Sequence, residues 1–173
     1  MKNVAHIWIP DSTPEEYVTK LTHTEGVPNY NSNVIRNVLL RTGPERLGMT
    51  AVDGGAHVGL LTMQLAKHFA TVYAFEPVPK NFDCLVRNLE GSSNVTTVRA
   101  ALSNVSGPLT MCHDRKSYSC AVVDPQTTKS KEVVGVTANT LDQYGLKVGF
   151  LKLDVEGHEY EALLGAERTL ATK

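Results

Sequence analysis

The segment Thr50-Ala-Val-Asp-Gly-Gly-Ala-His-Val-Gly-Leu-Leu-Thr-Met-Gln-Leu-Ala-Lys-His-Phe-Ala-Thr-Val-Tyr-Ala-Phe-Glu-Pro77 decides the fold that the sequence predicts. Its pattern predicts a strand that ends at Asp53, a glycine-rich turn that runs to Gly59, and a helix with apolar residues at helical spacing. A second strand, Thr71 to Phe75, then delivers Glu76 at its carboxyl end. This order is typical of a βαβ unit that binds a nucleotide.

Each residue type in this segment has a physical reason to contact a ligand. Glycines let the backbone turn sharply and let a ligand come close to the main chain. Free N–H groups at the start of a helix bind polar groups, and an acid about 20 residues after the turn can accept hydrogen bonds from ribose hydroxyls. A tight corner without a ligand is the alternative interpretation. The candidate cofactor-binding residues of this segment are Asp53, Gly54, Gly55, Ala56, His57, Val58, Gly59, Glu76 and Pro77.

The order of acid and glycines indicates which nucleotide binds. The dinucleotide fingerprint is G-x-G-x-x-G, whereas this chain has Asp53-x-Gly55-x-x-x-Gly59. An acid at the strand end repels a pyrophosphate and suits a cationic amino group, such as that of S-adenosylmethionine. A nicotinamide-dependent oxidoreductase is a weaker alternative, because the chain has no Tyr-x-x-x-Lys pair for hydride transfer.

Three further segments carry a family resemblance: Ala74-Phe-Glu-Pro-Val-Pro-Lys-Asn-Phe82, Ala100-Ala-Leu-Ser103 and Leu151-Lys-Leu-Asp-Val-Glu-Gly-His-Glu159. With the glycine turn, they resemble the FkbM-type family of class I methyltransferases over roughly residues 47 to 170. The family usually has Asp-Val-Gly-Ala-Asn-Ile-Gly in the turn, and this chain has Gly54 and His57 in place of that Val and Asn.

The resemblance implies a fold, a cofactor and an activity. The fold is α/β, with a Rossmann-like, mostly parallel sheet of strand order 3-2-1-4 and helices on both faces. The cofactor is S-adenosyl-L-methionine, and the acceptor is a hydroxyl group of a sugar or another small metabolite. In this fold the strand that ends near residue 100 meets the adenine, so Ala101 and Leu102 are candidate cofactor contacts.

The middle of the chain continues the alternation and then departs from it. A helix from Pro79 to Leu89, ended by Gly91, precedes a strand from Val95 to Arg99. Residues 104 to 137 have no helical period and are β-prone, which predicts a small antiparallel insertion; a helical turn at Asn139 to Tyr144 follows. The apolar face expected for the helix consists of Phe82, Leu85, Val86 and Leu89.

The last predicted strand, Val148 to Leu153, is apolar except for Lys152. Such a run suits a parallel strand that is buried on both faces. Its carboxyl end, where ligands bind in open α/β sheets, carries Asp154, Glu156 and His158. A helix from Tyr160 to Leu170 follows, and we interpret Glu159 and Glu161 as stabilising charges in its first turn.

Asp154 is the first candidate for a general base that takes the acceptor's proton, and Glu156 and His158 are the second. Asp154 could instead bind the amino group of the cofactor, and the sequence leaves both roles open. The same three residues could hold a divalent metal, but Gly157 interrupts the extended spacing that such a site needs. We therefore predict no metal site.

The three cysteines, Cys84, Cys112 and Cys120, lack paired spacing and indicate reduced thiols. No C-x-x-C motif supports a metal site at Cys112-His113 and Cys120. Reduced thiols, together with the missing signal-peptide pattern, predict a cytoplasmic protein. The formal net charge of −1 points to neither nucleic acid nor a membrane surface, and no apolar run reaches transmembrane length.

A single domain is expected for residues 1–173, with an N-terminal cap over 1–48 and the Rossmann-like core over 49–173. In the cap, Ile7 to Pro10 suggests an edge strand and Ser32 to Gly43 a helix. Thr13-Pro-Glu-Glu16 has the pattern of a helix start with a capping box. Trp8, His23 and Tyr30 are interpreted as packing residues of the cap, with acceptor contact as the alternative.

The end of the chain raises a further expectation. The resemblance implies more strands beyond the last helix, so the strand at Val148 would be a sheet edge, which is prone to pairing. We expect a fragment of a longer protein, or an edge that is covered by the Ile7 strand or by a second copy in a homodimer. A truncated, non-catalytic cofactor-binding module is the alternative function.

Overall fold

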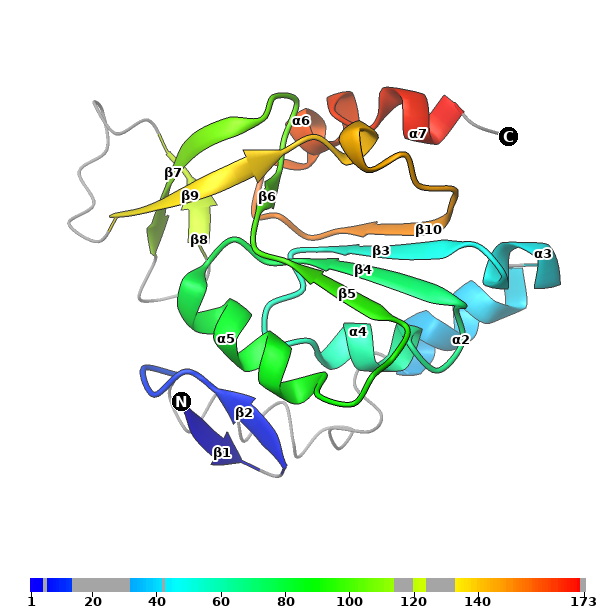
Figure 1. Ribbon diagram of the computed structural model, residues 1–173, viewed down its shortest axis with the longest axis horizontal. Coiled ribbons are helices and arrows are strands. Elements are labelled where there is room, and N and C mark those ends of the chain that lie inside the picture. The colour runs from blue at the N-terminus through cyan, green and yellow to red at the C-terminus, as the bar shows by residue number, and fades with distance from the viewer. Residues whose placement is uncertain (5, 14–31, 42, 114–119, 124–132, 172–173) are drawn as a thin grey trace.

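A computed structural model describes residues 1–4, 6–13, 32–41, 43–113, 120–123 and 133–171. Its centre is a parallel sheet in the order β10 (Val148–Leu153), β3 (Thr50–Gly54), β4 (Thr71–Phe75) and β5 (Val95–Val98). Numbered in chain order within this sheet, the strands lie in the order 3-2-1-4. The predicted α/β class with a parallel sheet is confirmed (Figure 1).

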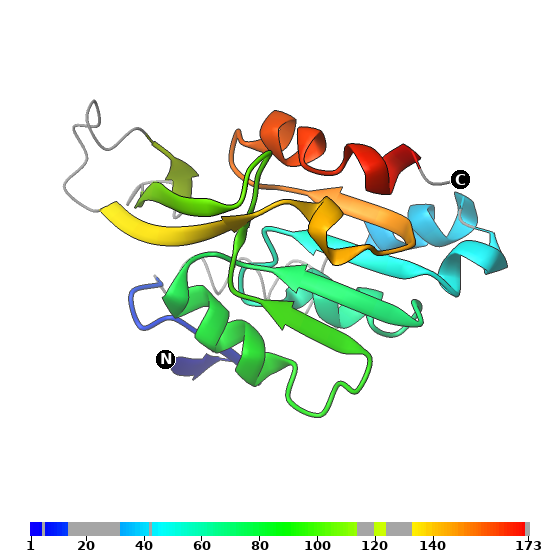
Figure 2. The ribbon, with the colours of Figure 1, turned by 45° about the horizontal axis from the view of Figure 1, so that its top comes forward.

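Helices cover both faces of this sheet (Figures 1 and 2). One face carries three helices, α2 (Ser32–Arg41), α4 (Leu60–Leu65) and α5 (Pro79–Asn88). The other carries α6 (Glu159–Leu164) and α7 (Glu167–Ala171). A short helix, α3 (Pro44–Leu47), which the sequence did not predict, precedes β3.

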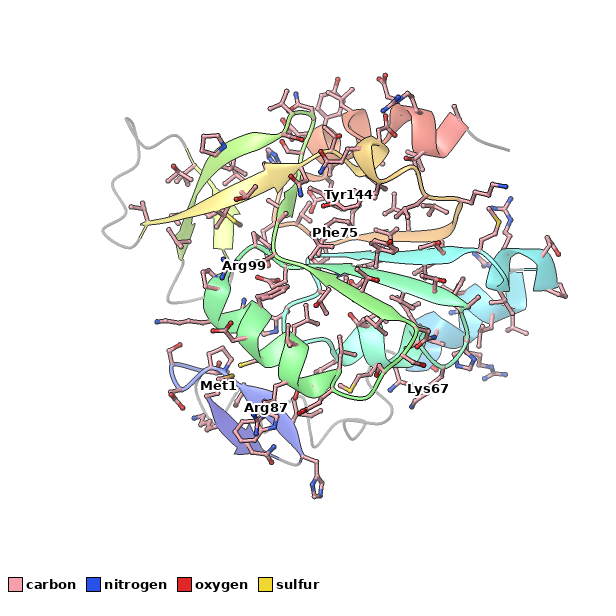
Figure 3. All side chains as sticks on the ribbon, in the orientation of Figure 1. Met1, Lys67, Phe75, Arg87, Arg99 and Tyr144 are labelled. Atoms are coloured by element: carbon pink, nitrogen blue, oxygen red, sulfur yellow. The ribbon has the colours of Figure 1, made fainter. Side chains whose placement is uncertain are left out.

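Alternation along the strands supplies one core on each face. Val72 of β4 packs with Leu61 and Leu65 of α4, whereas Phe75 of the same strand packs on the α6 side. Phe75 and Tyr144 lie edge to face, with ring centroids 5.2 Å apart (Figure 3). Tyr144 belongs to η2 (Leu141–Tyr144), the predicted helical turn.

The two helices that follow the glycine turn and β4 differ in part from the prediction. Helix α4 ends at Leu65, and Asn94 Nδ2 donates to the carbonyl oxygens of Ala66 and Phe69 in the turns that follow. On α5, Leu85 is buried as expected, but Val86 is 45% exposed. The N-terminal hairpin packs on the side of α5 that carries Cys84 and Asn88 and leaves Val86 exposed.

That hairpin consists of β1 (Lys2–Val4) and β2 (Ile7–Ile9), which pair antiparallel. Trp8 N donates to Asn88 Oδ1 at 2.7 Å, and Asn88 Nδ2 donates to the carbonyl oxygens of Trp8 and Val58 at 2.8 Å. The Arg87 guanidinium lies 4.6 Å from the Trp8 ring centroid, beside the hairpin in Figure 3. Trp8 therefore packs the cap onto α5.

The hairpin does not cover the edge of the sheet, so this expectation for the Ile7 strand was wrong. In the described part of the chain β10 pairs only with β3, and all six of its residues are half-buried. The prediction of burial on both faces fails because β10 is an edge strand there. Most of the proposed Thr13–Glu16 capping box, His23 and Tyr30 lie outside the described residues.

The predicted β insertion is present as a second sheet (Figure 1). Its strands lie in the order β6 (Ala101–Leu102), β9 (Val133–Asn139), β7 (Gly107–His113) and β8 (Cys120–Val122). Strand β6 runs parallel to β9, and β7 runs antiparallel to both β8 and β9. The insertion therefore replaces the helix of a regular crossover between β5 and β10.

The predicted last helix is divided into α6 and α7 at Gly165. A Cβ at Gly165 would overlap the carbonyl oxygen of Ser103, so the backbones approach closely here. The Asp142 carboxylate accepts hydrogen bonds from Arg168 N at 3.0 Å and Thr169 N at 2.8 Å at the start of α7. None of the helices in the described residues is long and apolar enough to cross a membrane.

Candidate functional site

The glycine turn joins the carboxyl ends of β3, β4 and β10. Gly55 and Gly59 have φ angles of 76° and 91°, and His57 also has a positive φ of 52°. Gly55 N and Ala56 N donate to the Phe75 carbonyl oxygen at 3.0 and 2.9 Å. A Cβ at Gly55 would overlap the backbone of residue 154, so only glycine fits this place.

The buried carboxylate of Glu76 fixes the turn to the end of β4. Its Oε2 accepts a hydrogen bond from His57 N at 2.9 Å, and its Oε1 accepts from Val78 N at 3.0 Å and Asn81 Nδ2 at 3.3 Å. Burial raises the pKa of Glu76, and the hydrogen bonds oppose this rise. A carboxylate has about four lone-pair sites, so these donors leave room for one more.

Asp53 does not face the site as a free charge. Its carboxylate is fully buried, Oδ2 accepts a hydrogen bond from Thr62 Oγ1 at 2.7 Å, and Oδ1 lies 3.0 Å from Lys152 Nζ. That last contact is an ion pair without hydrogen-bond alignment, since Oδ1 accepts no hydrogen bond from the described residues. The sequence predicted that Asp53 pairs with a cationic group of the ligand. In the structure, Lys152 already lies beside the Asp53 carboxylate as its cation.

Lys152 is a site residue that sequence reasoning missed. Its ammonium also donates to the carbonyl oxygens of Gly54 at 3.1 Å and Gly55 at 2.8 Å, so it holds the turn from the side of β10. The sequence signal for this role was a lysine in an otherwise apolar strand. A single cation in an apolar strand needs a partner, and Asp53 lies opposite Lys152 on the adjacent strand β3.

His57 is half-buried in the turn. Burial and the nearby Lys152 charge lower the pKa of His57 to about 4, against an opposing effect of Asp154. The imidazole is therefore neutral near pH 7 and offers one donor and one acceptor.

The loop between β10 and α6 presents Asp154 and Glu156 as exposed residues. Asp154 N donates to the Gly54 carbonyl oxygen at 3.1 Å, which keeps the start of the loop beside the turn. The Glu159 carboxylate accepts from Val155 N at 3.0 Å and Gly157 N at 3.3 Å, and hydrogen bonds from its own N–H and from these two groups lower its pKa. Glu159 therefore holds the loop, as its interpretation as a structural charge predicted.

His158 contacts protein groups through both ring nitrogens. Nε2 lies 2.9 Å from Ser103 Oγ, and Nδ1 lies 3.5 Å from Glu161 Oε2. Ser103 is 2% exposed and was missed as a partner, although the sequence placed it at the end of the Ala100–Ser103 motif.

The remaining candidates lie around the turn. Leu102 is buried in the core on the α6 side, and its Cδ1 would lie 3.1 Å from a Cβ at Gly54. Ala56 and Val58 are buried in the cores, so only their backbones could meet a ligand. Among the residues described, the structure brings together the turn, Glu76, Leu102 and Asp154, and no three His, Cys, Asp or Glu side chains converge as metal ligands.

Comparison with known proteins identifies the family of this chain. The model of the methyltransferase FkbM domain matches residues 53–173. Methyltransferase sdnD of Sordaria araneosa is 29% identical over 154 residues, covering 67% of this chain and 60% of its own length. Methyltransferase 1 of Beauveria bassiana is 28% identical over 144 residues, covering 67% of this chain and 57% of its own length.

Among solved structures, the methyltransferase FkbM from Methylobacillus flagellatus superposes with a TM-score of 0.49 at 20% identity, covering 72% of this chain and 30% of that one. A SAM-dependent methyltransferase from Leishmania major superposes with a TM-score of 0.41 at 26% identity, covering 53% and 36%. By the family match over most of its length, the chain belongs to the FkbM methyltransferase family. It spans about 60% of the length of the curated relatives it matches.

Proposed function

We propose that this chain binds S-adenosylmethionine and transfers its methyl group to a hydroxyl of a sugar or another small metabolite. The observation that carries the proposal is the buried Glu76 carboxylate, which holds the glycine turn at the carboxyl edge of the sheet. In open α/β sheets this edge is the place of ligand binding.

The residues at this edge fit the cofactor in three respects. Glu76 has a remaining lone-pair site for a ribose hydroxyl. Leu102 packs beside Gly54 with a side chain that is 2% exposed, so it offers its backbone at this edge to an adenine ring. Asp154 is an exposed acid in a loop beside the turn, and it can receive a cationic amino group now that Lys152 neutralises Asp53.

The chemistry that S-adenosylmethionine supplies when bound is an electrophilic methyl group on a sulfonium sulfur. The protein has to orient the acceptor and remove its proton. Asp154 is our first candidate for both charged roles, because one carboxylate oxygen can pair with the amino group while the other accepts the hydroxyl proton. Glu156, exposed in the same loop, is the second candidate for the base.

Calorimetric titration with S-adenosylhomocysteine, and with NAD as the control, tests this proposal. Micromolar binding of S-adenosylhomocysteine and no binding of NAD would support it. The control is needed because the Lys152 ion pair removes the negative charge that argued against a pyrophosphate. Binding of NAD alone would support the oxidoreductase alternative.

The alternative function expected from the sequence is a non-catalytic cofactor-binding module. Transfer of a radiolabelled methyl group to a panel of small hydroxyl compounds separates the two. Binding of S-adenosylhomocysteine without transfer to any of them would favour the module.

A further inference from the structure

We infer that His158 is a positioning residue that ties the end of β6 to the start of α6 and thereby holds the Asp154–Gly157 loop against the glycine turn. This inference rests on the proposed function and reverses the expectation that His158 acts as a base.

His158 forms a bridge between Ser103 and Glu161. His158 Nε2 lies 2.9 Å from Ser103 Oγ, and its Nδ1 lies 3.5 Å from a carboxylate oxygen of Glu161. The His158 side chain is 13% exposed. The ring therefore lies between two segments that are distant in sequence, with a polar group at each nitrogen.

Both ring nitrogens of His158 face protein groups. Ser103 Oγ lies 2.9 Å from Nε2 and also donates to Asn104 Oδ1 at 3.3 Å, so the direction of the His158–Ser103 bond follows the tautomer of the ring. If the ring is protonated, Nε2 donates to Ser103 Oγ. With Ser103 Oγ at Nε2 and Glu161 Oε2 at Nδ1, both ring nitrogens are occupied by protein groups, and we therefore assign His158 to positioning and not to proton transfer.

Ser103 is held in place by its backbone. Its backbone N donates to the Asn139 carbonyl oxygen at 2.9 Å, and its own carbonyl lies so close to Gly165 that no side chain fits between them. Ser103 thus belongs to the rigid contact between the second sheet and the break of the α6–α7 segment, and it gives His158 a firm partner.

The Asp154–Gly157 loop, which is followed by His158, has a strained backbone. Glu156 and Gly157 have φ angles of 56° and 91°, two consecutive residues in the left-handed region, which is costly for Glu156. Glu159 holds this loop from inside by accepting hydrogen bonds from Val155 N and Gly157 N. His158 fixes its far end, and the loop conformation in turn places Asp154 beside Gly54.

Two probes distinguish positioning from general stability. S-adenosylhomocysteine carries the amino-acid end that Asp154 would bind, whereas methylthioadenosine has the same nucleoside without that end. Calorimetry with both probes is applied to Ser103→Ala, His158→Gln, the double variant and Glu161→Gln, which removes a charge at the surface. The controls are His68→Gln and Ser93→Ala at exposed positions, and thermal unfolding identifies any variant that does not fold.

We expect Ser103→Ala and His158→Gln each to weaken S-adenosylhomocysteine binding by about three- to tenfold, with less than about twofold change for methylthioadenosine. The double variant should lose little more than either single variant, because both remove one bond. Equal loss for the two probes, additive losses, or unchanged binding in every variant would overturn the inference. If the wild type binds neither probe, the proposed function fails, and this inference fails with it.

Discussion

The Lys152 ammonium lies 3.0 Å from Asp53 Oδ1 and joins the strands β10 and β3 at the place where the glycine turn begins. The pair is mostly shielded from water, since the Lys152 side chain is 20% exposed and that of Asp53 is fully buried. The ion pair with Asp53 and the hydrogen bonds of Lys152 to the Gly54 and Gly55 carbonyl oxygens together hold the start of the glycine turn in place.

Lys152→Met should destabilise the protein by about 3–5 kcal/mol, because it leaves the buried Asp53 carboxylate without its cation. Denaturant unfolding measures this loss, with Lys80→Met at an exposed position as the control. Asp53→Asn combined with Lys152→Met should be more stable than Lys152→Met alone. If the double variant is the less stable one, the ion-pair explanation is wrong.

Gly55→Ala should abolish folding or ligand binding, because the methyl group would overlap the backbone of residue 154. Gly91→Ala is the matched control: Gly91 has a similar positive φ of 88°, and a Cβ there would have no neighbour within 4 Å. That control should cost about 1–2 kcal/mol from the left-handed backbone alone. Similar unfolding free energies for the two variants would contradict the close approach.

His57 predicts a pH dependence of stability. Its pKa falls from the usual 6.5 to about 4 in the folded protein, so between these values the unfolded chain binds more protons and stability decreases as the pH falls. His57→Asn tolerates the positive φ and should raise the melting temperature relative to the wild type at pH 5 more than at pH 7.5. An equal difference at both pH values would contradict the assignment, and His68→Asn at an exposed position is the control.

The lowered pKa of Asp142 predicts a second loss of stability at a more acidic pH. Burial alone would raise its pKa, but hydrogen bonds from Thr169 and Arg168 at the start of α7 outweigh this effect and lower it. The stabilisation is therefore present above the unfolded pKa of about 4 and is lost as the pH falls further. Asp142→Asn should cost about 1 kcal/mol at pH 7 and less at pH 2 to 3, because the amide nitrogen cannot replace the carboxylate oxygen that accepts from Arg168 N.

Denaturant unfolding at both pH values checks the Asp142 prediction, with Asp83→Asn at an exposed position as the control. A cost that stays the same at low pH would show that the charge of Asp142 is unimportant.

Local patterns predicted the central sheet well. The bounds of β4 and β10 agree with the sequence, because each mostly apolar run ends directly before an acid, Glu76 or Asp154. The glycine turn was predictable for a similar reason, since Gly55 and Gly59 are needed at positive φ.

Contacts between distant segments explain what the sequence did not predict. The N-terminal hairpin packs on the side of α5 that carries Cys84, and Val86 stays exposed. At Gly165 the backbone lies against the carbonyl of Ser103, and the carboxylate of Asp53 is neutralised by Lys152, almost 100 residues away. Periodicity along the chain carries no information on such partners.

The cofactor site is tested most directly by a calorimetric titration of the wild type and of Glu76→Ala with S-adenosylhomocysteine, with Glu90→Ala at an exposed position as the control. We predict micromolar binding by the wild type and the control. Glu76→Ala should weaken binding by about 1–3 kcal/mol, because a charged acceptor for the ribose is lost. Unchanged affinity in a folded Glu76→Ala variant, or no binding by the wild type, would contradict the proposed cofactor site.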